Sequence, residues 1–322
     1  MQNRENALKE WLKSTLEDLD FLLVPLAGDA SFRRYFRAQS HYKTYVVMDA
    51  PPAQEDLVPF LYISKLFSNA QVRVPKIHAI NLTDGFLLLE DLGDDLLLNF
   101  LTSETADAYY CQAFKELEKI QAIACNDEKI PLFNQNFMLQ EMSHCRNWFL
   151  DQYLNLTLNT EEENLWEQSL NWIANEISQQ PRCIIHRDFH SRNLMRLPSG
   201  VGVIDFQDAM QGPFTYDLVS LLKDCYIQWP REQVRGWVEM FYHQSTLAQT
   251  VSLNEYLRAF DLCGLQRHLK VLGIFSRLNL RDGKPGYLKD LPRTLSYVLE
   301  CTGLYSELQS LHFFFQNRVY LP

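Results

Sequence analysis

The chain has 322 residues, of which 47% are hydrophobic, and a formal net charge of −10. This composition can fill an apolar core and excludes a disordered chain. The negative charge argues against bulk nucleic-acid binding, which needs a basic surface.

The seven cysteines are scattered, odd in number and never spaced C-x-x-C. We therefore expect reduced thiols in a cytoplasmic protein. Residues 1–16 are polar and lack the apolar core of a signal peptide. No apolar stretch is long enough to cross a bilayer, so we expect no membrane association. No feature of the sequence indicates an obligate protein partner.

The first part of the chain, after a short N-terminal helix, reads as an antiparallel sheet with one inserted helix. Alternating apolar residues and turn signals predict strands over 21–26, 32–37, 44–48, 76–81 and 85–89, and a helix over 55–67. Alternation along 32–37 places Arg33 and Arg34 on opposite faces of their strand.

The pattern then becomes helical. Apolar spacing predicts helices over 104–124, 138–154, 161–177, 216–227, 232–244, 254–279 and 291–305, with short strands over 184–186 and 202–204. A β-rich part followed by a larger helical part is typical of an α+β chain with two lobes. We place the lobes at residues 1–92 and 93–322, with residues 90–93 as the connector.

The motif that carries chemistry lies in residues 183–208. It has the form His186-x-Asp188-x4-Asn193, followed by an apolar run that ends on Asp205. A kinase catalytic loop followed by a metal-binding aspartate has this form. In that reading Asp188 accepts a hydrogen bond from the attacking hydroxyl. Asn193 and Asp205 supply the oxygen ligands that Mg²⁺ prefers, and His186 braces the loop.

Two other interpretations of this loop stay open. The motif can be a chance polar loop after a buried strand. His186 and His190 can also be read as a metal-binding pair, although that spacing requires a helix and here follows a strand. Asp217, at the start of a predicted helix, is either an N-cap or a tie for the loop backbone.

A phosphate cradle is predicted at the turn between the first two strands. Backbone N–H groups from Asp29 onward, next to Gly28, and the Ser31 hydroxyl can hold phosphate oxygens. An ordinary β-turn explains the same residues.

Kinases usually place a lysine on the third strand, where this chain has Met48, so Glu55 lacks a lysine partner. A positive charge must then come from Arg33, Arg34 or Lys43.

These motifs resemble the aminoglycoside phosphotransferase and choline kinase-like superfamily over nearly the whole chain. Within it, the flanking runs are most similar to the bacterial anomeric N-acetylmuramate/N-acetylglucosamine kinase family, and Met48 agrees with those runs. The matching runs are His186-Arg187-Asp188 with Arg192-Asn193-Leu194-Met195, and residues 28–37, 46–52, 205–209, 212–217, 266–270 and 281–285.

The resemblance implies a protein-kinase-like fold, with a small antiparallel-sheet N-lobe that binds ATP and a large helical C-lobe. It implies adenine held at the Glu90 carbonyl and the Leu92 amide, Asp188 as base, and Mg²⁺ on Asn193 and Asp205. The implied activity is transfer of the γ-phosphate to the C1 hydroxyl of the amino sugar, in peptidoglycan recycling.

Side chains around the predicted base are candidates for sugar contacts: His190, Arg192, Gln207 and Asp208. The lactyl carboxylate of muramic acid has possible partners in the basic run Arg267, His268, Lys270, Arg277, Arg281 and Lys284, which can equally be a solvated helix face. Two other functions stay open. One is a kinase for an aminoglycoside, a choline-like amine or another sugar, and the other is a non-catalytic nucleotide-binding protein, suggested by Met48.

Overall fold

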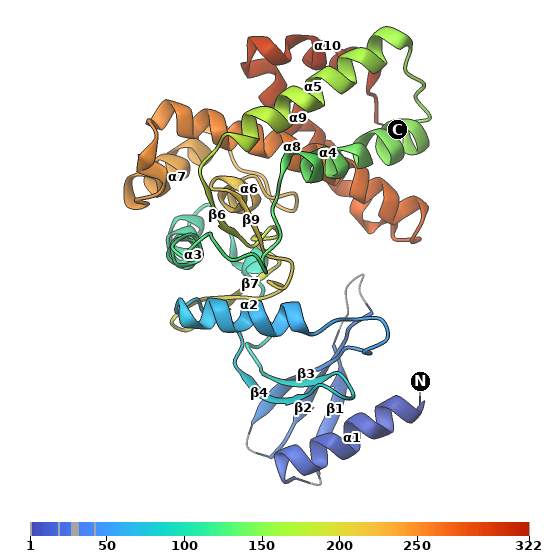
Figure 1. Ribbon diagram of the computed structural model, residues 1–322, viewed down its shortest axis with the longest axis vertical. Coiled ribbons are helices and arrows are strands. Elements are labelled where there is room, and N and C mark those ends of the chain that lie inside the picture. The colour runs from blue at the N-terminus through green and yellow to red at the C-terminus, as the bar shows by residue number, and fades with distance from the viewer. Residues whose placement is uncertain (1, 19, 27–31, 42, 322) are drawn as a thin grey trace.

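The computed structural model describes residues 2–18, 20–26, 32–41 and 43–321 (Figure 1). Three predicted phosphate-binding residues, Gly28, Asp29 and Ser31, lie outside these ranges. The described residues fold into a sheet-containing lobe and a larger helical lobe, which confirms the α+β, two-lobed prediction. No helix in the described ranges is long and apolar enough to span a membrane.

The smaller lobe is built on a five-stranded antiparallel sheet in the order β1-β2-β3-β5-β4. Its strands are β1 (Leu22–Pro25), β2 (Arg34–Gln39), β3 (Thr44–Asp49), β4 (Ile77–Asn81) and β5 (Phe86–Glu90). Helix α1 (Gln2–Leu16) covers one face, where Leu8 and Leu12 pack on Phe36. The other face carries Met48 and Leu87 and joins the main core.

Helix α2 (Val58–Asn69) begins three residues later than predicted, because Pro59 occupies its first turn and suits that position. In Figure 1 this helix lies between the sheet and the helical lobe. Phe60 and Phe67 of α2 both pack on Phe206 of the helical lobe, with ring centroids 5.0 and 5.8 Å apart. Helix α2 therefore joins the two lobes through aromatic contacts.

The connector after β5 is held by ion pairs from an arginine of the smaller lobe. Arg37 on β2 binds Asp91 and Asp94, at 2.7 and 2.8 Å. The connector ends at a short 3-10 helix, Leu97–Phe100. Opposite Leu92 lies Gly202, where a Cβ atom would come within 2.8 Å of the Leu92 side chain. The absence of a side chain at Gly202 thus allows the connector to approach the helical lobe closely.

The larger lobe packs around the long helix α8 (Leu253–Leu280), which contacts α4, α5, α6 and α9. The other helices are α3 (Ala106–Gln121), α4 (Gln135–His144), α5 (Thr160–Ser178), α6 (Tyr216–Leu222), α7 (Arg231–Gln244), α9 (Leu291–Leu304) and α10 (Gln309–Arg318). Gly273 of α8 meets the backbone at His144 and Cys145, where a Cβ atom would lie 2.2 Å from the His144 carbonyl carbon.

Two antiparallel ribbons form the base of the catalytic loop. One pairs β6 (Arg182–Ile185) with β9 (Met210–Pro213), and the other pairs β7 (Leu194–Leu197) with β8 (Gly200–Val203). The sequence patterns indicated β6 and β8 but missed β7, β9 and α10. The predicted helix 138–154 is α4 followed by a π-helix, Cys145–Tyr153. The predicted helix 216–227 ends at Leu222, because Lys223 leaves helical backbone angles.

Candidate active site

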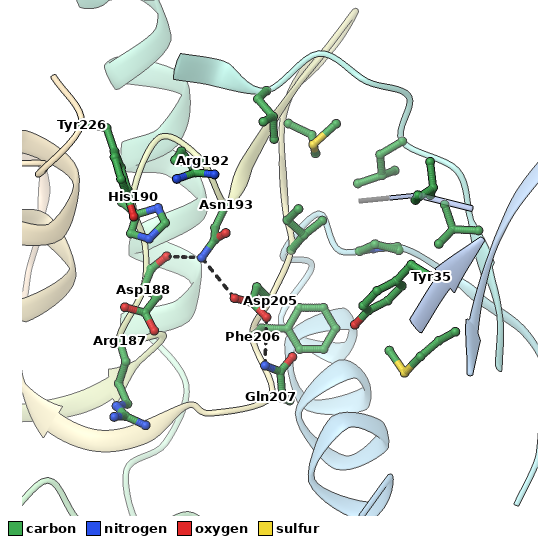
Figure 2. A pocket seen from close by; sticks show the side chains of 18 of the residues that line it. Tyr35, Arg187, Asp188, His190, Arg192, Asn193, Asp205, Phe206, Gln207 and Tyr226 are labelled. Atoms are coloured by element: carbon green, nitrogen blue, oxygen red, sulfur yellow. Dashed lines mark hydrogen bonds between the residues drawn. The ribbon is translucent and has the colours of Figure 1, made fainter. Parts of the chain in front are cut away.

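A cavity of about 780 Å³ lies between the two lobes, within the size range of small-molecule sites. One half is lined mostly by apolar side chains of the sheet, the connector and β7. These include Val46, Met48, Leu89, Leu92, Met195 and Ile204. The other half, called the acceptor half below, is lined by the catalytic loop, α8 and the segments that follow α6 and α8. Figure 2 shows part of this lining.

The catalytic loop brings the three predicted central residues together, as Figure 2 shows. The Asn193 side-chain amide donates to the Asp188 carbonyl at 3.0 Å and to Asp205 Oδ2 at 3.4 Å. His186 is fully buried and its Nε2 atom pairs with the Ile204 carbonyl at 3.0 Å, as the bracing interpretation expects. Among the described residues no group of three metal-binding His, Cys, Asp or Glu side chains occurs.

Two residues of the loop have left-handed backbone conformations, Arg187 with φ 77° and Asp205 with φ 63°. Side chains other than glycine rarely adopt such angles, and strain of this kind gathers at functional sites. Arg187 directly precedes Asp188, and Asp205 is itself the second carboxylate. The backbone is therefore bent where the two carboxylates face the cavity.

Two buried carboxylates accept hydrogen bonds from the backbone of the loop and fix its position. Asp217 lies in the first turn of α6 and accepts hydrogen bonds from the backbone N–H groups of His186 and Arg187, at 2.6 and 2.9 Å. Thr215 occupies the N-cap position, so Asp217 ties the loop and is not the cap. Burial raises the pKa of Asp217 to about 7, and the two N–H donors oppose this shift.

Asp224 is the second anchor, and the sequence patterns gave no indication of it. It accepts from Ser191 N at 3.0 Å and from Tyr226 N at 2.9 Å, and it also binds the Ser191 hydroxyl. In the sequence Asp224 lies within the predicted helix 216–227, whereas in the structure it follows the end of α6. Asp224 therefore fixes the loop and the segment that carries Tyr226 at the same time.

Asp188 lies in a positively charged environment. Burial would raise its pKa, but the cations Lys270 and Arg267 outweigh burial and hold this pKa well below the usual range. Asp188 is therefore a carboxylate at neutral pH. Lys270 is held in place by the buried Glu141, whose carboxylate lies 3.0 Å from its Nζ atom and 2.9 Å from Arg187.

The donor set at Asn193 and Asp205 fits Mg²⁺. This ion is usually held by one or two carboxylates together with substrate phosphates, so a cluster of three acids is not needed. Gln207 donates to Asp205 Oδ1 at 2.9 Å, while its own Oε1 atom is buried without a hydrogen-bond partner among the described residues. A metal ion or its bound water next to Asp205 can satisfy such an oxygen.

The two arginines at the start of β2 separate as the strand alternation predicted. Arg33 directly precedes β2, on the face of Tyr35, which lines the cavity. Arg33 does not itself line the cavity, and its Nε atom lies 3.1 Å from Glu55. Glu55 thus has an arginine partner in place of the usual lysine.

Arg34 lies on the opposite face, where it and Arg4 of α1 bind the buried Asp49. Arg34 does not line the cavity, so the structure gives no support to its assignment to the phosphates, which stays a prediction.

Some of the remaining predicted residues line the cavity and others do not. Glu90 and Leu92 line the cavity at the connector, and His190, Arg192 and Gln207 line it around the loop. The exposed Asp208 does not line it. Lys43 does not line this cavity but lines a second pocket on the sheet, with Lys76 and His78. Of the basic run, Arg267, Lys270 and Lys284 reach the cavity, whereas His268 is buried against Tyr297.

The two-lobed fold, with Asp188, Asn193 and Asp205 at the interlobe cavity, defines a kinase-like phosphotransferase. Residues 23–256 match the phosphotransferase enzyme family, and the chain belongs to that family.

The chain is 38% identical over 321 residues to an N-acetylmuramate/N-acetylglucosamine kinase of Pseudomonas putida, covering 96% of this chain and 94% of that one. An enzyme of the same name from Neisseria meningitidis is 38% identical over 317 residues, with coverage of 96% and 94%. These relatives confirm the family resemblance seen in the sequence.

Solved structures share the fold at lower identity. The aminoglycoside phosphotransferase APH(2'')-Ib, with ADP bound, has 19% identity and a TM-score of 0.61, covering 91% of this chain and 97% of that one. The choline kinase LicA from Streptococcus pneumoniae has 15% identity and a TM-score of 0.64, with coverage of 92% and 99%. The kinase-like fold predicted from the sequence is confirmed.

Proposed function

We propose that the protein transfers the γ-phosphate of ATP to the anomeric C1 hydroxyl of N-acetylmuramate or N-acetylglucosamine, in peptidoglycan recycling. The observation that carries the proposal is the position of Asp188 beside Asn193 and Asp205, in a chain that shares 38% identity with kinases named for these sugars. An anomeric hydroxyl is more acidic than the other sugar hydroxyls, so a carboxylate suffices to orient it.

Each part of the site has a role in this reaction. Asp188 accepts the hydrogen bond of the sugar hydroxyl and aligns it with the γ-phosphate. Asn193 and Asp205 hold Mg²⁺, which when bound neutralises charge on the phosphate oxygens. Lys270 and Arg267 line the cavity and lower the pKa of Asp188. Fixed cations at this position favour the charge that spreads over the phosphoryl group as it transfers.

The nucleotide is assigned to the lobe of residues 1–92. The apolar half of the cavity accepts the adenine ring, with the Glu90 carbonyl and Leu92 amide as hydrogen-bond partners along the connector. The Glu90 carboxylate is engaged by Arg73 at 2.7 Å, so its side chain is held aside. Arg33 and the 28–31 turn, including Gly28, Asp29 and Ser31, are assigned to the phosphates.

The test is ATP consumption against a panel of free sugars and amines, with ³¹P NMR of the product. We expect turnover with both acetamido sugars and a phosphate signal coupled to the anomeric proton. A phosphate on C6, or turnover with amines alone, would contradict the proposal. The second outcome would favour an aminoglycoside or choline-like substrate, for which the acceptor half is poorly suited because Arg192, Arg267, Lys270 and Lys284 line it.

A further inference from the structure

The cations of the acceptor half fall into two groups that differ in their partners. The deep group, Lys270 and Arg267, lies next to Asp188 and lowers its pKa. Lys270 is bound to Glu141 at 3.0 Å. Arg267 is only 4% exposed and its Nη1 atom lies 3.4 Å from Cys225 Sγ. These side chains are already fixed by the protein and lie where the transferred phosphate must pass.

The rim group, Arg192 and Lys284, lines the same cavity but is exposed to solvent. In the part of the chain that the structure describes, neither cation forms an ion pair with a carboxylate within 4.0 Å. Arg192 lies over the ring of Tyr226, 4.7 Å from its centroid. The guanidinium thus lies against the aromatic ring of Tyr226.

Lys284 belongs to the same wall of the cavity. It precedes the short helix Pro285–Asp290, which carries Tyr287, and its backbone N–H donates to the Leu278 carbonyl at the end of α8. Tyr287 packs on Phe275 at 5.2 Å and Tyr226 packs on Phe275 at 6.2 Å. The rim therefore consists of two unpaired cations around an aromatic cluster, next to the catalytic loop.

We propose that Arg192 and Lys284 form a subsite for a carboxylate, and that this subsite recognises the lactyl group of N-acetylmuramate. The inference rests on the proposed function. N-acetylmuramate is N-acetylglucosamine with a lactyl ether on O3, so the two sugars differ by one carboxylate. A guanidinium fork matches a carboxylate in geometry as well as charge.

The position of the two groups explains why the rim, and not the deep group, takes this carboxylate. The sugar C1 hydroxyl must face Asp188, and the lactyl group extends from C3, on the other side of the acetamido-bearing carbon. A carboxylate at Lys270 would compete with the phosphate and with Glu141. At the rim, the carboxylate meets two cations. Among the described residues, no acidic side chain forms an ion pair with either of them.

The experiment compares kcat/KM for the two sugars in Arg192→Ala and Lys284→Ala. We expect each variant to lose N-acetylmuramate efficiency by roughly tenfold to a hundredfold more than N-acetylglucosamine efficiency, the size typical of a charged hydrogen bond. Arg192→Lys keeps the charge without the fork and should retain part of the preference. Lys289→Ala is the matched control, because Lys289 is an exposed lysine of the same segment that does not line the cavity.

An equal loss on both sugars would overturn the inference, because it would mean that these side chains hold the ring and not the acid. Full retention of both efficiencies in both alanine variants would also overturn it. If the unaltered protein turns over neither sugar, the proposed function itself fails, and the inference fails with it. Turnover of both sugars by the unaltered protein therefore separates the two failures.

Discussion

At the scale of single residues, the site depends on a carboxylate kept ionised by neighbouring cations. Asp188→Asn preserves the shape of this side chain but removes its ability to accept the hydroxyl proton. We expect kcat to fall roughly 10²–10⁴-fold, while ADP still binds in isothermal titration calorimetry. Asp20→Asn is the control, since Asp20 is exposed and does not line the cavity. Near-normal turnover of Asp188→Asn would refute its assignment as the base.

The same environment leads to a prediction about pH. A carboxyl group whose pKa is lowered in the folded protein stays ionised as the pH falls, and the direction of the shift at Asp188 is downward. We therefore expect kcat to show no loss from Asp188 between pH 7 and about pH 5, where an ordinary aspartate is still ionised too. The effect of the lowered pKa on kcat should become visible when Lys270 is replaced.

Lys270→Met removes the first of the cations that lower this pKa. The acid limb of the kcat profile should then move to higher pH, with a lower plateau because a fixed charge near the phosphate is lost. Lys289→Met serves as the matched control. An acid limb that stays in place in Lys270→Met would show that Lys270 does not set the ionisation of Asp188.

At the scale of elements, strand β2 separates two arginines by function. Arg33→Ala should raise the KM for ATP, because it removes the cation that pairs with Glu55 on the cavity side. Arg34→Ala should leave this KM unchanged and lower the unfolding temperature, because Asp49 is fully buried and loses one of its two arginines. Steady-state kinetics and thermal unfolding check both halves. The reverse pattern would place Arg34 at the phosphates.

The crossing of α4 and α8 depends on the missing side chain of Gly273. Gly273→Ala would force a Cβ atom to 2.2 Å from the His144 carbonyl carbon, so we expect a loss of about 1–3 kcal/mol in the free energy of unfolding, as in overpacked cores. Gly236→Ala, on the exposed face of α7 with nothing within 4 Å, should gain about 0.5–1 kcal/mol. Urea denaturation measures both. Equal effects would show that helix propensity alone acts at Gly273.

At the scale of the whole molecule, the two lobes, most elements and the catalytic triplet were predictable, because apolar spacing and the loop motif are local signals. The long-range pairings were not. Asp224 reaches back to Ser191 and Glu141 reaches Lys270 through the packing of α4 on α8, and neither contact leaves a spacing pattern in the sequence. The pairing of Arg34 with Asp49, beside Arg4 of helix α1, was likewise not visible in the sequence, although the strand face of Arg34 was predicted.

The ion pairs of Arg37 with Asp91 and Asp94, together with the packing of Phe60 and Phe67 on Phe206, fix the connector and α2 between the lobes. The connector and the catalytic loop are thus held by separate contacts. The domain boundary at residue 92 stays a prediction.

Asp224 has a consequence for changing the substrate range of this enzyme by protein engineering. The same carboxylate holds Ser191 of the catalytic loop and the backbone of Tyr226, the aromatic wall of the acceptor half. Mutations on that wall therefore disturb the position of the base, and selection for a new acceptor there would work against turnover. The neighbouring segment of Lys284 and Tyr287 has no such link to the loop backbone among the described contacts. A library aimed at new acceptors should begin at that segment.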